Sequence, residues 1–547
     1  MTTRSRWRLW SAVALPLLLA ASACSSDDAE TGTATTVSST AVAAPSESIT
    51  PATTAAPTTT AEVPLVAPAT ITGPIISDNG PVQPQPAVPL PEGYTEDEFF
   101  LAGDAARYEV AGERGADGFW DAAVADTAAY QTRILVRRPP AAVFSGVVIV
   151  EWLNVSATES SPDWGYLIEE IAEQGHAYVA VSAQSLGVIG GESILSVEVD
   201  EEAAAEAGTA TEPANEGGLV NTDPERYGTL NHPGDAYAYD IFDHVGASLI
   251  ADPATLLDGL EPVTVLALGE SQSAGFLTTY LNAVHPLTDT YDAFLVHSRG
   301  AGGAPLDGSF GRASDDEEEP DTSFVSEGQL IRADLNVPVF IVQAETDLTL
   351  LGYSLARQPD SDLVHTWELA GTAHADAHVI RAIVGGPRDP SVGSFLSCEG
   401  LINAGPHHEG VSAALRHLVT WTQTGQRPPS GDRLELTDTD PVAIARDDLG
   451  RALGGVRNPL VDVPVLITTG DPASGIAEIT EDFGVCDLFG TSIPLDAAAL
   501  LELHGSADDY ITAFEASTEA AVEAGFLLPT DADQLRAEAE ENRALFG

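Results

Sequence analysis

Short runs of apolar residues alternate along the chain with segments of helical spacing. The clearest runs cover residues 146–152, 177–182 and 263–268. Such nearly continuous runs are typical of parallel strands that are buried on both faces. Between the first two runs, residues 164–174 have apolar positions at helical spacing and end before Gly175, a usual helix terminator. The pattern predicts an α/β fold with a mostly parallel central sheet and helices on both faces.

Further apolar patterns predict the rest of the sheet and a helical end of the chain. Additional strands are expected at residues 98–101, 132–136, 293–297, 338–342 and 364–369. Residues 411–422 are amphipathic, so we expect a helix there that closes the core. A strand-like run at 463–467 and helical patterns within 496–546 continue the chain beyond that core.

Changes in composition divide the chain into four parts. Residues 1–23 have the features of a signal peptide, and residues 24–68, mostly Thr, Ala, Ser and Pro, are expected to form a disordered tether. Residues 69–430 form the predicted core, with an insertion at about 184–233. Residues 431–547 are interpreted as a C-terminal extension packed on the core, because no linker-like stretch isolates them.

The N-terminus predicts export and a lipid anchor. Arg4, Arg6 and Arg8 precede an apolar segment that ends in small residues, as in secretory signals. The residues before Cys24 resemble a bacterial lipobox, in which the cysteine is lipidated and becomes the new N-terminus. The alternative is ordinary cleavage that leaves Cys24 unmodified. We therefore expect a cell-surface lipoprotein attached to the membrane, or alternatively a secreted protein.

The number of cysteines supports the same view. The chain has 3 cysteines, and a lipidated Cys24 leaves Cys398 and Cys486 as an even pair. In an oxidising, exported setting we expect these two residues to form a disulfide that closes a long loop.

Charge excludes one class of partner. The net charge is −60, from 23 basic and 83 acidic residues, and the chain contains no lysine. Binding to nucleic acid depends on clustered positive charge, so we expect no nucleic-acid partner. The acidity fits either a saline habitat or a solubilising exported surface.

A candidate nucleophile follows the strand at residues 263–268. The sequence continues as Gly269-Glu270-Ser271-Gln272-Ser273 and then takes up a helical pattern. A strand, a sharp turn with a central serine and a helix form a nucleophile elbow, which raises the serine Oγ above the sheet. The usual motif is G-x-S-x-G, and here Ser273 replaces the second glycine. Ser271 is therefore the predicted nucleophile.

A serine needs a base and a carboxylate, which in this class of sheet follow in the order Ser, acid, His. Asp347 lies just past the strand at 338–342 and is the favoured acid, with Glu345 as its rival. Both could instead be solvated loop residues in so acidic a chain. His374 follows the next strand in a loop of small residues and is the predicted base.

Backbone donors and other histidines complete the predicted site. The N–H of Gln272 should stabilise an oxyanion, together with the N–H of Asn154 or Val155 after the strand at 146–152. His407 and His408 could be a metal pair, but no Glu or Cys stands beside them at a zinc-like spacing. We interpret these two histidines as loop residues and expect no metal.

Several stretches resemble a known family. The chain looks like an α/β-hydrolase, and within that superfamily it resembles the actinobacterial "alpha/beta hydrolase domain" proteins, which are thought to hydrolyse carboxylic esters. The matching stretches are VEWLNVS (150–156), RYGTLNHPGDAYAYDIF (226–242), LGESQSA (268–274), FLVHSRG (294–300), QAETD (343–347), AGTAH (370–374), INAGPHH (402–408) and LGGVRNPLVDVP (453–464). The resemblance implies a Ser-acid-His triad carried by Ser271, Asp347 or Glu345, and His374.

These observations predict an exported serine hydrolase that cleaves carboxylic esters through an acyl-enzyme. The partner is a small-molecule ester, no cofactor is expected, and the oligomeric state is undetermined. An alternative keeps the triad and acts on amides, peptides or lactones. A third interpretation, from another class, is a catalytically inactive surface protein that uses a hydrolase-like scaffold for binding.

Overall fold

The structure is a computed structural model. It describes residues 66–112, 114–191, 194–195, 217–310, 325, 327–384, 388–394, 396, 398–477, 479 and 483–547. All of these belong to one compact unit, Glu62–Gly547. The predicted signal peptide, Cys24 and residues 24–65 of the predicted tether lie outside the described residues, so these features remain predictions.

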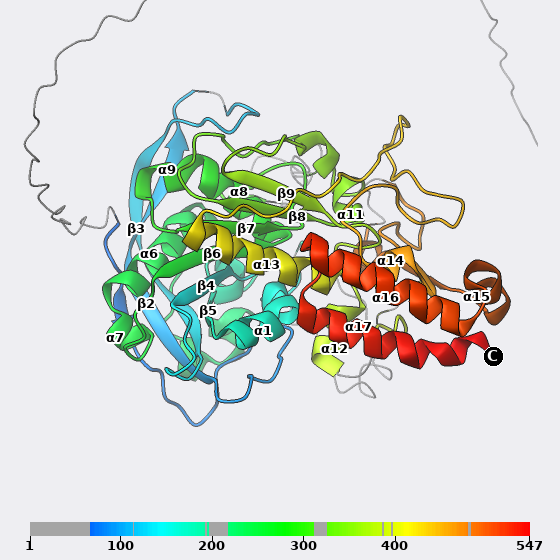
Figure 1. The fold of residues 1–547 in the computed structure, drawn as a ribbon. Coiled ribbons are helices and arrows are strands. Elements are labelled where there is room, and N and C mark those ends of the chain that lie inside the picture. The colour runs from blue at the N-terminus through cyan, green and yellow to red at the C-terminus, as the bar shows by residue number, and fades with distance from the viewer. Residues whose placement is uncertain are drawn as a thin grey trace, which may run out of the picture. The chain divides into compact units, whose positions relative to one another are not determined.

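A nine-stranded sheet forms the centre of the described part of the chain (Figure 1). Its strands are β1 (Thr70–Thr72), β2 (Thr95–Val110), β3 (Ala122–Arg138), β4 (Val147–Trp152), β5 (Ala177–Val181), β6 (Thr264–Glu270), β7 (Ala293–His297), β8 (Val339–Gln343) and β9 (Val364–Glu368). They lie in the order β1-β2-β3-β5-β4-β6-β7-β8-β9. Neighbours from β5 to β9 are parallel, whereas β1, β2 and β3 pair antiparallel. The predicted mostly parallel sheet is confirmed.

Two apolar clusters cover the two faces of this sheet. Successive side chains of a strand point to opposite faces, so Val148 and Val150 join one cluster while Val147 and Ile149 join the other. Helices α6 (Ala238–Ala251) and α8 (Gln272–Thr279) pack in the first cluster, and α1 (Pro162–Gln174) and α13 (His407–Thr424) pack in the second. The central strands are buried throughout, which explains their continuous apolar runs.

The remaining short helices connect these elements. Within the described residues they are α2 (Ser185–Ile189), α4 (Gly218–Thr222), α5 (Pro224–Tyr227), η1 (Asp235–Tyr237), α7 (Pro253–Leu256), η2 (Tyr280–Val284), α9 (His285–Thr288), α11 (Glu345–Leu348), η3 (Tyr353–Ala356), α12 (Ala377–Val384) and α14 (Pro459–Asp462). Much of the predicted insertion at 184–233 lies outside the described residues.

The predicted bounds of two strands were too narrow. Strands β2 and β3 are 16 and 17 residues long and pair along their whole length, far beyond the predicted 98–101 and 132–136. Their outer halves contain exposed and small residues, which are held by cross-strand pairing, so the sequence has no apolar run there.

His407 and His408 are not loop residues, because they form the first turn of α13 and are buried.

The C-terminal region, residues 431–547, has an apolar cluster of its own. It contains the hairpin of β10 (Leu466–Thr469) and β11 (Thr491–Pro494), a 3-10 turn η4 (Val485–Leu488), and helices α15 (Ala497–His504), α16 (Ala507–Ala524), α17 (Pro529–Asn542) and η5 (Arg543–Phe546). Helices α16 and α17 lie side by side (Figure 1). The region contacts the core where Phe526 packs on Trp367, with ring centroids 5.2 Å apart.

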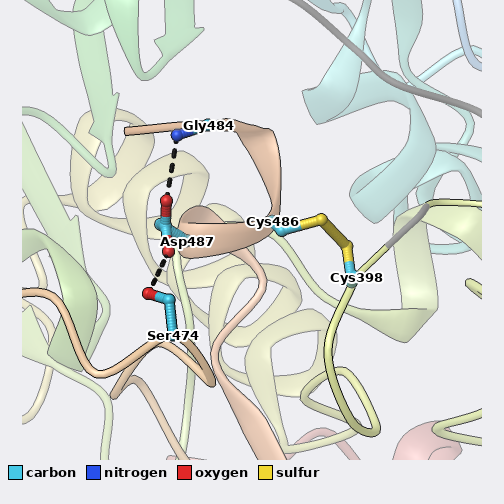
Figure 2. The surroundings of a disulfide bond; sticks show 5 residues. All are labelled: Cys398, Ser474, Gly484, Cys486 and Asp487. Atoms are coloured by element: carbon cyan, nitrogen blue, oxygen red, sulfur yellow. Dashed lines mark hydrogen bonds between the residues drawn. A yellow bond between two sulfur atoms is a disulfide. The ribbon is translucent and has the colours of Figure 1, made fainter. Parts of the chain in front are cut away.

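A disulfide joins Cys398 to Cys486 of η4, as predicted (Figure 2). Beside it, the Asp487 carboxylate accepts hydrogen bonds from the Gly484 N–H and the Ser474 hydroxyl. These contacts fix the turn that carries Cys486. Among the described residues, no helix combines the length and apolar character needed to cross a membrane.

Candidate active site

The turn between β6 and α8 presents Ser271 in an unusual backbone conformation. Its φ is +60° and its ψ is −118°, which L residues rarely adopt, and its N–H donates to the His297 carbonyl at 3.0 Å. A Cβ at Gly269 would approach the Ser273 Cβ to 2.9 Å, so this position accepts no side chain without a shift. The small residues that suggested an elbow are therefore required by the turn itself.

His374 connects Ser271 to Asp347 through two short hydrogen bonds. Its Nε2 lies 2.8 Å from the Ser271 Oγ, and its Nδ1 lies 2.6 Å from the Asp347 Oδ1. The other Asp347 oxygen accepts the Ala344 N–H at 2.6 Å, which holds the carboxylate in place. The three side chains follow β6, β8 and β9, because the carboxyl ends of parallel strands meet at one edge of the sheet.

Glu345, the rival acid, does not face His374. One of its oxygens accepts the Gly371 N–H at 2.5 Å, and the other accepts the Gly470 N–H at 3.0 Å and Arg446 at 2.8 Å. Burial raises the pKa of Glu345, although Arg446 opposes that shift. Of the two predicted acids, only Asp347 contacts the imidazole, while Glu345 ties the loop before His374 to the C-terminal region.

Glu270 is a neighbour of the imidazole that sequence reasoning missed. Its Oε1 lies 3.2 Å from the His374 Nε2, the same nitrogen that contacts Ser271. Burial raises the pKa of Glu270, while the neighbouring His374 opposes that shift. Burial alone would lower the pKa of His374, but the Glu270 and Asp347 carboxylates outweigh it and raise that pKa above its usual value. An acidic residue at the end of an apolar strand, directly before the serine, was the available signal.

The three predicted oxyanion donors have different surroundings. Gln272 begins α8, so its N–H belongs to the first turn, whose amides have no partner within the helix. The Val155 N–H donates to the Gln272 Oε1 at 3.2 Å, beside Ser271. The Asn154 N–H donates to the Ser160 carbonyl at 2.9 Å and is therefore already engaged. Of the three predicted donors, the N–H groups of Gln272 and Val155 are therefore better placed to stabilise an oxyanion than that of Asn154.

A small apolar cavity of about 50 Å³ opens beside Ser271 and His374. The apolar side chains that line it are Ile194, Leu195, Phe310, Leu351, Ile479, Phe483 and Leu488. A larger cavity of about 260 Å³ lies between the β10–β11 hairpin and helices α16 and α17, and Ser271 does not line it. The reactive groups identify the smaller cavity as the candidate site, because the larger one has no serine–histidine pair in its wall.

The C-terminal region also supports the loop that carries His374. The Ala375 N–H donates to the Leu488 carbonyl at 3.0 Å, and Leu488 belongs to the turn held by the disulfide. The Asn403 side chain donates to the carbonyls of Gly371 and Thr469, at 3.1 and 2.9 Å. The disulfide therefore anchors a turn that contacts both the histidine loop and the cavity.

His407 and His408, which the sequence singled out, lie in the core with a third histidine, His297. The His297 Nδ1 lies 2.8 Å from Asp163, and its Nε2 lies 2.7 Å from the His407 Nε2. Burial lowers the pKa of His297 to about 3, which keeps its ring neutral. His408 places its Nδ1 2.6 Å from the Tyr166 carbonyl. None of these three side chains lines the cavity beside Ser271.

Solved structures with some likeness to this chain include hydrolases of three kinds. An esterase from Rhizomucor miehei is 11% identical, with 60% of this chain and 85% of that chain covered and a TM-score of 0.29. A glucuronoyl esterase from Solibacter usitatus is 11% identical, covering 49% and 70%, with a TM-score of 0.22. A dienelactone hydrolase from Anabaena variabilis is 14% identical, covering 40% and 69%, with a TM-score of 0.20.

A family model gives the decisive comparison. No curated protein matches the chain. The model described as "Alpha/beta hydrolase domain" matches residues 49–537, which include β1 to β11 and every residue of the predicted site. The sheet and the serine turn after its strand β6 agree with that match, so this chain belongs to the alpha/beta hydrolase domain family.

Proposed function

We propose that the protein is an exported serine hydrolase that cleaves carboxylic esters. The observation that carries the proposal is the unbroken chain of hydrogen bonds from the Ser271 Oγ through His374 to Asp347, at 2.8 and 2.6 Å. A serine hydroxyl becomes nucleophilic when a base accepts its proton, and a carboxylate on the far ring nitrogen fixes the correct tautomer of that base. Asp347 accepts from Nδ1, so Nε2 is the nitrogen that takes the serine proton.

In the acylation step, the Ser271 Oγ attacks the acyl carbon while the His374 Nε2 accepts its proton. The Gln272 N–H stabilises the negative oxygen that forms. The Val155 N–H now donates to the Gln272 side chain at 3.2 Å, and an oxyanion in this position would replace that acceptor. Collapse of the tetrahedral intermediate expels the alcohol, which takes the proton from His374.

In the deacylation step, water repeats the same chemistry on the acyl-enzyme. His374 removes a proton from the water, the acyl–serine bond breaks, and the proton returns to Ser271. The buried charge of Asp347 stabilises the imidazolium in both halves of the reaction. No step in this sequence calls for a cofactor.

The cavity favours an apolar acyl group. Its lining is mostly apolar, and its polar side chains are Ser156, Ser271, Gln272, Ser298 and His374. Esters need less protonation of the leaving group than amides, so they are the less demanding substrates for this triad. The intact contacts among all three side chains also favour catalysis over a binding role, since an inactive relative would tolerate the loss of any one of them.

Export is part of the proposal. The disulfide between Cys398 and Cys486 is typical of proteins in oxidising compartments. Anchoring through a lipidated Cys24 and the absence of a nucleic-acid partner remain predictions from the sequence.

Hydrolysis of p-nitrophenyl acetate by the purified protein tests the proposal. We expect turnover by the wild type and a loss of at least about 10⁴-fold in kcat for Ser271→Ala, because the nucleophile is removed. Ser273→Ala is the matched control, since Ser273 lies in the same turn but does not line the cavity. A folded Ser271→Ala variant with wild-type kcat would reject the proposal.

A further inference from the structure

Three potential metal ligands converge where α17 of the C-terminal region meets α1 and α13 of the core. They are Glu169 of α1, His408 of α13 and Asp531 of α17. The His408 Nε2 lies 3.8 Å from an Asp531 oxygen and 4.0 Å from a Glu169 oxygen, and one ligand atom of each residue lies within 4.8 Å of the others. None of the three lines the cavity beside Ser271.

His408 is oriented as a ligand. Its Nδ1 lies 2.6 Å from the Tyr166 carbonyl, which can only accept a hydrogen bond, so Nδ1 carries the proton. The Nε2 atom faces the two carboxylates, is buried, and has no hydrogen-bond partner among the described residues. Metal-binding histidines commonly show this arrangement, in which a carbonyl on one nitrogen sets the tautomer and directs the other nitrogen at the ion.

The ring is also fixed in its plane. His408 stacks on His378 with ring centroids 4.0 Å apart and planes within 8°. Only 3% of the His408 side chain is exposed to solvent, and only 7% of the Asp531 side chain. The second Asp531 oxygen is likewise buried without a hydrogen-bond partner in the described part of the chain. Buried polar atoms without partners are costly, so these two point to a missing ligand.

The side chains around these three residues carry a strong excess of negative charge. Glu170, Glu173 and Glu409 add their carboxylates to those of Glu169 and Asp531. Two guanidinium groups lie nearby: Arg416 pairs with Glu170 and Glu173, and Arg388 pairs with Glu409 and Glu538. Four of these carboxylates therefore share two arginines, and no arginine pairs with Glu169 or Asp531 among the described residues. A bound cation would relieve this excess of negative charge.

We propose that Glu169, His408 and Asp531 bind a divalent cation, with Zn²⁺ as the best match. One imidazole nitrogen and two carboxylate oxygens are ligands that zinc accepts, whereas calcium and magnesium prefer sites made of oxygen alone. Tetrahedral ligands at about 2.1 Å from zinc lie roughly 3.4 Å apart, so the observed 3.8 and 4.0 Å require a small closure. The Glu169 side chain is 50% exposed and supplies both the flexibility and the entry path.

The ion has a structural role in this arrangement. It joins Asp531 of the C-terminal region to two helices of the core, beside the hydrogen bond from Gln534 to Glu169 at 3.0 Å. The site lies apart from Ser271, so the inference does not depend on the proposed hydrolase activity. Zinc should therefore stabilise the fold whether or not the protein hydrolyses esters.

Zinc titration of the EDTA-treated full-length protein, in competition with a chromophoric chelator, tests this site. We expect one Zn²⁺ per chain and a rise in Tm when it binds. His408→Gln and Asp531→Asn should each weaken zinc binding at least tenfold, because each removes a direct ligand. Asp533→Asn is the matched control on the same helix, since the Asp533 side chain is 81% exposed and points at Arg536. It should bind zinc as the wild type does.

A misfolded variant would not obscure the result. Glu169→Gln changes a half-exposed side chain at the rim, so it should preserve the metal-free Tm and still lose zinc affinity. The proposal is overturned if the wild type binds no zinc at stoichiometric concentration. It is equally overturned if Glu169→Gln and Asp531→Asn bind zinc as tightly as Asp533→Asn.

Discussion

The central sheet and the C-terminal region are built and held in different ways. The sheet is covered on both faces by large apolar clusters, and it carries Ser271, Asp347 and His374 at the ends of its strands. The C-terminal region has a smaller apolar cluster of its own, adds side chains such as Val456 and Leu528 to a core cluster, and also makes polar contacts with the core. Examples are the ion pair of Glu345 with Arg446 and the hydrogen bond from Ala375 to Leu488.

The core supplies the reactive side chains, and the C-terminal region helps to hold one of them in place. The reactive side chains come from the core, whereas the loop that carries His374 is fixed partly by residues of the C-terminal region. Changes to the hydrogen-bonded chain should therefore abolish turnover and leave the fold intact. Changes to the supporting contacts should weaken the fold and affect turnover less.

The two acids of α11 give the sharpest contrast and the largest expected effect. Asp347→Asn should lower kcat by about 10³- to 10⁴-fold, because the amide favours the wrong tautomer of His374, with little change in Tm. Glu345→Gln should instead lower the free energy of unfolding by about 2–4 kcal/mol, because it removes the buried partner of Arg446 and leaves only the exposed Asp471. Steady-state kinetics and urea unfolding of both variants measure the two effects. A larger fall in kcat for Glu345→Gln than for Asp347→Asn would contradict these separate roles of the two acids.

Removal of the disulfide should lower the stability of the fold. Cys398 and Cys486 are 88 residues apart in sequence, and cross-linking a loop of that length restricts the unfolded chain. The double variant Cys398→Ser/Cys486→Ser should lose about 2–4 kcal/mol in the free energy of unfolding, measured by urea titration. Reductant should lower the stability of the wild type and leave the double variant unchanged. Equal stability of the two proteins without reductant would contradict this view.

Glu270 should produce the smallest change, a shift in pH dependence. His374 must be neutral to accept the serine proton, so activity falls as the pH drops through its pKa. The Glu270 carboxylate raises that pKa, and Glu270→Gln should therefore move the acidic limb of kcat/KM to lower pH. Glu261→Gln, an exposed change before β6, is the control. An acidic limb that stays in place or moves to higher pH would exclude this role for Glu270.

Sequence patterns predicted the central sheet better than the contacts between the core and the C-terminal region. The buried parallel strands carry continuous apolar runs, and the residues after β6, β8 and β9 could therefore be placed at one edge of the sheet. Asp347 and Glu345 remained alternatives, because two residues apart in one short helix they differ only in the direction of their side chains. That direction depends on Gly470 and Arg446, which come from a distant part of the chain.

The contacts of His408 were unpredictable for the same reason. Its neighbours Glu169 and Asp531 come from helices far apart in the sequence, so no local spacing of ligands exists to be recognised. Glu270 is the opposite case, because a charged residue at the end of a buried strand next to the nucleophile was visible in the sequence and went unused. Long-range polar contacts thus mark the limit of what the pattern of residues predicts here.

Labelling with a fluorophosphonate probe, followed by mass mapping of the modified peptide, shows whether Ser271 is an activated nucleophile. We expect a single adduct on Ser271, formed by the native protein and lost on denaturation or in His374→Ala, because only an activated serine reacts with such probes. A folded native protein that forms no adduct at Ser271, or that reacts equally well as His374→Ala, would contradict this expectation.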